Sequence, residues 1–240
     1  MKSLLPVKTL GASSSGRVFH AALTAISIKT GIGRTLLWLG VCLFLMPSGL
    51  FAQTLTHRYS FFNQPNGSLT ATDSVAGANG TLQGAAAILG GQLVLNGTSG
   101  TYLNLPGGLI SGNTAVTIES WVSFGTLPVN CFFFGLGNTD GGGAGENYIF
   151  CAPQIGRVAI TGVDPGWQGE QRADSGVNWS SQANLHVVAV FNPPAGRVSL
   201  YTNGVLAAIN TGVTTPLSSV NDVYSYIGKS LYTMDPYTPL

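Results

Sequence analysis

Two tryptophans and several polar side chains share one segment, residues 162–184, that contains no strand-like run. Gln168 follows Trp167 directly, and Asp174 lies between Trp167 and Trp179. Sites for sugars combine aromatic faces with polar groups that bond hydroxyls, so this segment is a candidate carbohydrate-binding loop. The alternative is that both tryptophans cover the edge of a packed core while the polar side chains are solvated.

Oxygen-bearing side chains suited to a cation gather around Asp140. Asn138, Asp140 and Glu146 flank a glycine-rich run, and Asp73 with Asn79 forms a smaller set of the same kind. Calcium binds carboxylate, amide and carbonyl oxygens supplied by irregular loops. The sequence therefore makes calcium a candidate cofactor, although no complete ligand set can be named.

A catalytic site is difficult to assemble from these residues. Retaining glycoside hydrolases need two carboxylates about 5 Å apart, and acids at alternate positions of a strand would share one face. The strand predicted at residues 116–122 offers Glu119 alone, two positions before Trp121. His57 and His186 fall within predicted strands, and no HExxH or GxSxG motif is present. We expect a protein without catalytic activity, and a divergent glycoside hydrolase is the weaker alternative.

Cys131 and Cys151 remain once the first 52 residues are set aside. They flank the glycine-rich run 140–145 as the two arms of a hairpin would. If the arms pair symmetrically about that run, the cysteines face each other near the Cα separation of about 5.5 Å that a disulfide requires. In an oxidising compartment we expect a disulfide, and the alternative is two buried free thiols.

The first 52 residues have the features of a secretory signal peptide. Basic residues and no acid occupy the start, an uninterrupted apolar run follows at residues 36–46, and small residues precede a predicted cleavage after Ala52. As a helix this apolar run would rise about 16 Å, roughly half of a bilayer's hydrocarbon thickness. The segment 1–52 is therefore predicted to direct export to the cell envelope or beyond, and an uncleaved anchor is the alternative.

Residues 53–240 are long enough for one domain with a substantial core. They keep five of the ten basic residues against all nine acids, a net charge of −4. That sign disfavours nucleic acid and anionic membrane surfaces as partners. Contact with a membrane is expected only through the N-terminal segment, if it is not cleaved.

Short runs rich in β-branched and aromatic residues recur along residues 53–240, separated by Gly, Asn, Pro and Ser clusters. This spacing predicts an all-β protein built as an antiparallel β-sandwich. Asn203-Gly204 gives the strongest hairpin signal, because both central residues of a type I′ turn need positive φ. The predicted strands are 55–62, 86–95, 101–105, 114–124, 131–136, 147–151, 156–161, 185–191, 197–202, 205–209 and 223–228.

Four stretches resemble the laminin-G-like, concanavalin A-like jelly-roll superfamily, in the version found in exported bacterial proteins. They are HRYSF at 57–61 with DSVAGANGTLQG at 73–84; LVLNG at 93–97; VTIESWV at 116–122; and LHVVAV at 185–190 with LYTNGVL at 200–206 and YIGKS at 226–230. The resemblance covers roughly residues 55–232 and concerns the scaffold, so it specifies a fold better than a ligand.

The resemblance implies an exported recognition module that binds carbohydrate or an extracellular protein at a cell surface. A structural or adhesion spacer, cut from a larger exported protein, is the alternative. Family members usually end with a strand of the type DExxIY, which is absent before Leu240. We therefore expect the domain 53–240 to be incomplete at its C-terminus, with one open sheet edge, for example at residues 55–62.

Overall fold

The computed structural model of the chain describes residues 53–240, so the predicted signal peptide lies outside the described residues. Within this range there is no α-helix, and four short 3₁₀ turns interrupt the loops. No helix among residues 53–240 is long and apolar enough to cross a membrane. The turns are η1 (Phe61–Asn63), η2 (Gly166–Gln168), η3 (Pro193–Ala195) and η4 (Leu217–Ser219).

The strands predicted at residues 185–191, 197–202 and 205–209 are confirmed, and they form a three-stranded antiparallel meander. β11 (Leu185–Asn192), β12 (Arg197–Thr202) and β13 (Val205–Asn210) pair antiparallel in sequence order. Asn203 and Gly204 have φ angles of 51° and 77°, as a type I′ turn demands. β6 (Val116–Val122) pairs with the other side of β11, so the first sheet has the order β13-β12-β11-β6.

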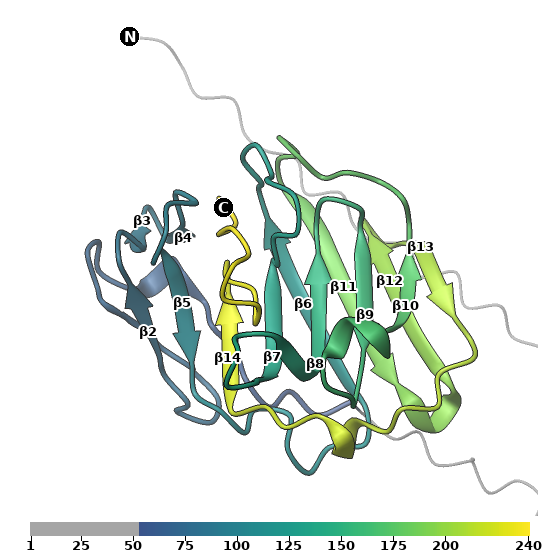
Figure 1. Ribbon diagram of the computed structural model, residues 1–240. Helices are drawn as coiled ribbons and strands as arrows, with labels where there is room; N and C mark the ends of the chain where they lie inside the picture. The colour runs from purple at the N-terminus through teal and green to yellow at the C-terminus, as the bar shows by residue number, and fades with distance from the viewer. Residues whose placement is uncertain (1–52) are drawn as a thin grey trace, which may run out of the picture. The chain divides into compact units, whose positions relative to one another are not determined.

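The second sheet is larger and contains eight strands (Figure 1). In spatial order they are β1 (Thr70–Ala71), β2 (Gly80–Gln83), β5 (Tyr102–Leu105), β14 (Tyr224–Ile227), β7 (Phe134–Thr139), β8 (Gly145–Ala152), β9 (Arg157–Ile160) and β10 (Gln171–Asp174). The strand predicted at residues 86–95 is instead a hairpin of β3 (Ala87–Leu89) and β4 (Gln92–Val94). Gly90 and Gly91 both have positive φ, which turns the chain at that point.

One hydrophobic core joins the two sheets. Strand β11 alternates buried and half-buried residues, which places Val187, Ala189 and Phe191 on its inner face. These side chains belong to one buried cluster with Ile149 of β8 and Val158 of β9. Burying a side chain of this size stabilises the fold by about 1.5–3 kcal/mol. The arrangement confirms the predicted antiparallel β-sandwich.

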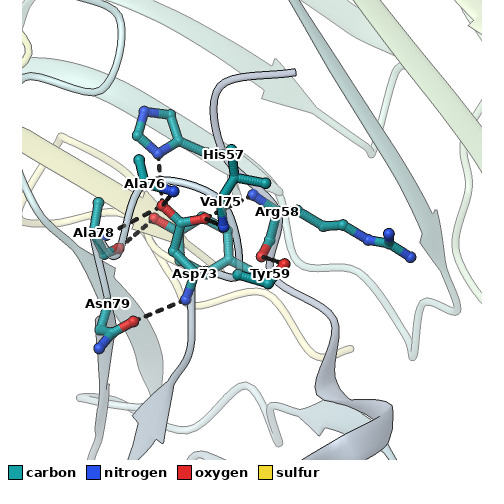
Figure 2. A network of polar contacts seen from close by, with 9 residues as sticks. His57, Arg58, Tyr59, Asp73, Val75, Ala76, Ala78 and Asn79 are labelled. Atoms are coloured by element: carbon teal, nitrogen blue, oxygen red, sulfur yellow. Dashed lines mark hydrogen bonds and ion pairs between the residues drawn. The ribbon is translucent and has the colours of Figure 1, made fainter.

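The segment predicted as the first strand, residues 55–62, forms only an isolated bridge between Tyr59 and Asp73 before η1 begins. The buried carboxylate of Asp73 replaces strand pairing there, because it gathers backbone N–H groups from both sides of the loop (Figure 2). Its Oδ1 accepts from the backbone N of Arg58 (2.9 Å) and of Val75 (3.0 Å). Its Oδ2 accepts from the backbone N of Ala76 (3.3 Å) and of Ala78 (3.1 Å). The same Oδ2 contacts Nδ1 of His57 (2.8 Å).

Burial alone would raise the pKa of Asp73, since it disfavours the charged form. The backbone N–H donors and the His57 ring outweigh burial and hold this pKa well below its ordinary value. Asn79 completes the loop by accepting a hydrogen bond from the Asp73 backbone N at 2.9 Å. Asp73 is thus a buried anchor that fastens the start of the domain to the loop after β1.

The predicted disulfide is not formed, and both cysteines are buried free thiols. The hairpin of β7 and β8 pairs Phe134, rather than Cys131, with Cys151. The register shifts between Leu136 and Asn138, where Gly137 lies against Tyr148 too closely for a Cβ atom. Pairing is nearly symmetric about the glycine-rich run, but that symmetry places Phe134, three residues after Cys131, opposite Cys151, so the expectation that the two cysteines face each other is wrong. Burial raises the pKa of the Cys151 thiol.

Strand β6 is an edge of the four-stranded sheet. The backbone N–H of His186 donates to Asn203 Oδ1, and its C=O accepts from Asn203 N, so both groups point away from β6. His186 and the opposing Trp121 are therefore a non-hydrogen-bonded pair, and the backbone N–H and C=O of Trp121 point away from β11. Beside the end of β6, Pro239 O accepts from Gly125 N at 3.2 Å, and Leu240 exchanges two backbone hydrogen bonds with Leu95. Strand β6 is therefore one open sheet edge in the described part of the chain, while residues 55–62 form no edge strand, and the incomplete C-terminus stays a prediction.

Replacing Asp73 by asparagine is expected to lower the free energy of unfolding by roughly 2–4 kcal/mol, because one buried charged acceptor serves several donors. Urea denaturation at neutral pH measures this. Glu119→Gln, at an exposed carboxylate, is the control and should change stability by less than about 0.5 kcal/mol. Equal effects of the two substitutions would contradict the anchoring role.

The same anchor predicts a pH dependence. Because folding lowers the pKa of Asp73, its contribution is present above the unfolded-state pKa of about 3.9 and is lost progressively as the pH falls below that value. Thermal melts should show a gap between wild type and Asp73→Asn at neutral pH that shrinks below about pH 4. A gap unchanged in strong acid would count against this assignment.

Candidate functional site

The two loop tryptophans that were predicted to act together lie in different environments. Trp179 is 2% exposed and belongs to the main core, where its ring packs 5.8 Å from that of Phe124. Trp167 is 62% exposed. The alternative interpretation, in which a tryptophan covers the core, is therefore correct for Trp179, whose buried ring offers no surface to a ligand.

The exposed Trp167 lies in η2, which is held firmly against the larger sheet. Its backbone N donates to the hydroxyl of Tyr232 at 2.9 Å. A Cβ atom at Gly166 would overlap the ring of Tyr148, so glycine is needed for this close approach. Gln168 is exposed beside Trp167. Trp167 and Gln168 thus keep accessible side chains on a fixed turn, and their role in binding stays a prediction.

Asp174, the fourth residue of the predicted loop site, is engaged by a protein cation. Its two carboxylate oxygens accept from Nε and a terminal nitrogen of Arg157 at 2.8 and 2.9 Å. Arg157 also approaches Glu170 at 3.4 Å, and Glu170 accepts from the Tyr148 hydroxyl at 2.8 Å. Burial raises the pKa of Glu170. These two carboxylates therefore converge on the Arg157 guanidinium, and Arg172 Nε, 3.5 Å from Asp174 Oδ2, supplies the second positive charge of the ion-paired network.

Two of the three candidate calcium ligands, Asn138 and Glu146, bond each other, and the third, Asp140, bonds the backbone. Asn138 Nδ2 donates to Glu146 Oε1 at 2.6 Å, and Asp140 Oδ1 accepts from Ala144 N at 2.7 Å. The oxygens of Asp73 accept N–H groups and so are occupied. No group of three or more His, Cys, Asp or Glu side chains suited to a metal occurs in residues 53–240. Calcium binding stays a prediction without further support.

A surface that sequence analysis missed lies on the outer face of the four-stranded sheet. Trp121 of β6 is 73% exposed although its strand neighbours pack inward. It lies directly opposite His186 of β11, and the two rings stack at 4.5 Å with an interplanar angle of 22°. Because directly opposed residues in antiparallel strands bring their side chains together, the strand register creates this aromatic pair.

Glu119 holds the other side of His186. Its Oε1 lies 2.7 Å from Nε2 of the imidazole, and the carboxylate is 63% exposed while the His186 side chain is 18% exposed. The ring is thus fixed by Trp121 on its face and by Glu119 at its edge. Within the described residues Glu119 makes no other ion pair. One carboxylate cannot serve as both acid and nucleophile, so this constellation suits binding better than glycoside hydrolysis.

The surface continues across the sheet away from the Trp121–His186 pair. Val188 lies opposite Glu119 on one side and Tyr201 on the other, and Tyr201 pairs with the exposed Leu206. We call this surface the Trp121 face. It consists of Thr117, Glu119, Trp121, His186, Val188, Tyr201 and Leu206.

The sequence of the domain matches the model of a known protein superfamily. The family model for the concanavalin A-like lectin/glucanases superfamily matches residues 96–239, and the chain belongs to this superfamily. No curated protein matches the chain.

Two solved structures have a similar fold. Domain 4 of AbnA, a GH43 extracellular arabinanase from Geobacillus stearothermophilus solved in complex with arabinotriose, is 22% identical, with a TM-score of 0.60 and coverage of 78% of this chain and 87% of that one. The binding domain of Paraclostridial Mosquitocidal Protein 1 is 13% identical, with a TM-score of 0.52 and coverage of 76% and 48%.

Alanine substitutions of Trp179 and Trp167 should have different effects on stability, because the first ring is in the core and the second is at the surface. Trp179→Ala is expected to cost about 3–5 kcal/mol of stability, as removal of a fully buried aromatic side chain does. Trp167→Ala should change stability by no more than about 0.5 kcal/mol, because most of that ring faces solvent. Chemical denaturation of both variants measures the difference, and similar losses would show that the assigned environments are wrong.

Proposed function

We propose that the chain is an exported, non-catalytic carbohydrate-binding module and that the Trp121 face is its principal binding surface. The observation that carries the proposal is the Trp121 side chain, which is 73% exposed although its ring stacks against that of His186. Exposed aromatic residues on a rigid sheet supply contact area with little loss of conformational entropy.

The chemistry of the face suits a neutral sugar. The flat faces of Trp121 and Tyr201 can pack against the C–H groups of pyranose or furanose rings. The exposed oxygen of Glu119 and the backbone groups at the β6 edge can bond sugar hydroxyls. Since Glu119 and His186 already fix one another, little ordering is needed when a ligand arrives.

Export and the absence of catalysis belong to the same proposal. The basic and apolar segments of residues 1–52 support export. A lone Glu119 on this face supports binding without bond cleavage. Tethered to a cell surface or secreted, such a module would hold a glycan without turning it over.

The proposal is tested by titrating the purified protein with neutral oligosaccharides, with arabinotriose as one of the probes. Trp121→Ala should weaken binding at least tenfold, because truncating a central aromatic contact costs about 2 kcal/mol or more. Trp167→Ala, at the exposed tryptophan of the η2 turn, is the matched control and should bind as wild type does. Binding lost with Trp167→Ala and kept with Trp121→Ala would move the site to the η2 loop.

A further inference from the structure

Lys229 follows β14 and is the one lysine in residues 53–240. Its side chain is half-buried, with Nζ 4.6 Å from the ring centroid of Tyr102 and 4.2 Å from that of Tyr226. A cation over aromatic faces is attracted by the ring quadrupoles. This attraction holds the ammonium group at a fixed place on the outer side of the eight-stranded sheet.

Two further tyrosines extend the aromatic surface around Lys229. Tyr224 stacks on Tyr226 at 5.9 Å, and Tyr237 lies 6.0 Å from Tyr102. Tyr224 is 37% exposed, which leaves part of this surface open to solvent. Across residues 53–240, none of the four hydroxyl groups makes a protein hydrogen bond, so each can still donate and accept.

No carboxylate of the described domain pairs with Lys229. The other residues on this part of the sheet surface are Thr81, Gln83 and Asn104, which are uncharged. The nearby acid in sequence, Asp235, instead accepts from Ser230 Oγ at 2.6 Å. Desolvation lowers the pKa of Lys229 without a carboxylate to offset it. Lys229 is therefore a cation without an ion-pair partner among the described residues.

We propose that Lys229 with Tyr102, Tyr224, Tyr226 and Tyr237 forms a second site, specific for a carboxylate-bearing saccharide such as a uronic acid unit. The carboxylate pairs with the ammonium group, the sugar ring packs on the exposed tyrosine face, and the free hydroxyls bond the sugar oxygens. This site lies on the eight-stranded sheet and the Trp121 face on the four-stranded sheet, so each proposal can be tested without the other.

The probes are trigalacturonic acid and its methyl ester, in which methyl groups replace the negative charges of the carboxylates. Titration calorimetry of the full protein at low salt should show tighter binding of the acid than of the ester. Lys229→Met keeps the apolar stem and removes the charge, and it should weaken binding of the acid about tenfold or more, as loss of one charge-assisted hydrogen bond does. It should leave ester binding nearly unchanged.

Arg197→Gln removes an exposed cation from β12 of the other sheet and is the matched control, with no expected change. Trp121→Ala should keep the preference for the acid over the ester, which separates this site from the Trp121 face. If thermal melting shows that Lys229→Met does not fold, Tyr224→Ala, at the exposed ring, is the second variant that tests the site. Equal affinity for acid and ester, or full affinity in both Lys229→Met and Tyr224→Ala, overturns the proposal.

Discussion

The pairing of β6 with β11 is the constraint on which the rest of the molecule depends. One register places Val122 and Val187 in the core and simultaneously sets Trp121 against His186 on the outside. Because side chains alternate along a strand, a slip by one residue would bury Trp121 and Glu119 and expose the apolar set. The register of this one strand pair thus determines both which side chains enter the core and which form the candidate binding surface.

Local signals were sufficient for much of the fold. Asn203-Gly204 demands a type I′ turn whatever surrounds it, and the alternating run in β11 needs one buried face. These features, with the family resemblance, predicted the sandwich correctly. Non-local pairing was harder to predict, because nothing in the residues near Trp121 indicates that His186 will lie across from it. The sequence showed Glu119 and Trp121 on one face, but the third member came from another strand.

Errors in the predicted sites have the same origin. Trp167 and Trp179 lie in the same segment without a strand signal, yet the fold buries Trp179 and exposes Trp167. The proposed Cys131–Cys151 bridge placed the two cysteines opposite each other in a hairpin, while the observed register sets Phe134 opposite Cys151 and leaves Cys131 three residues before it. In the same way, Asp73 was considered as a cation ligand, but its oxygens collect N–H donors that only the folded loop brings together.

The exposed edge of β6 has a consequence for how molecules of this protein meet. Thr117, Glu119 and Trp121 direct main-chain donors and acceptors outward, so two copies approaching side by side would find a template for one continuous intermolecular sheet. The carboxylate of Glu119 stands in the middle of that row. Two such charges brought face to face repel, so the residue that orients His186 also discourages self-association.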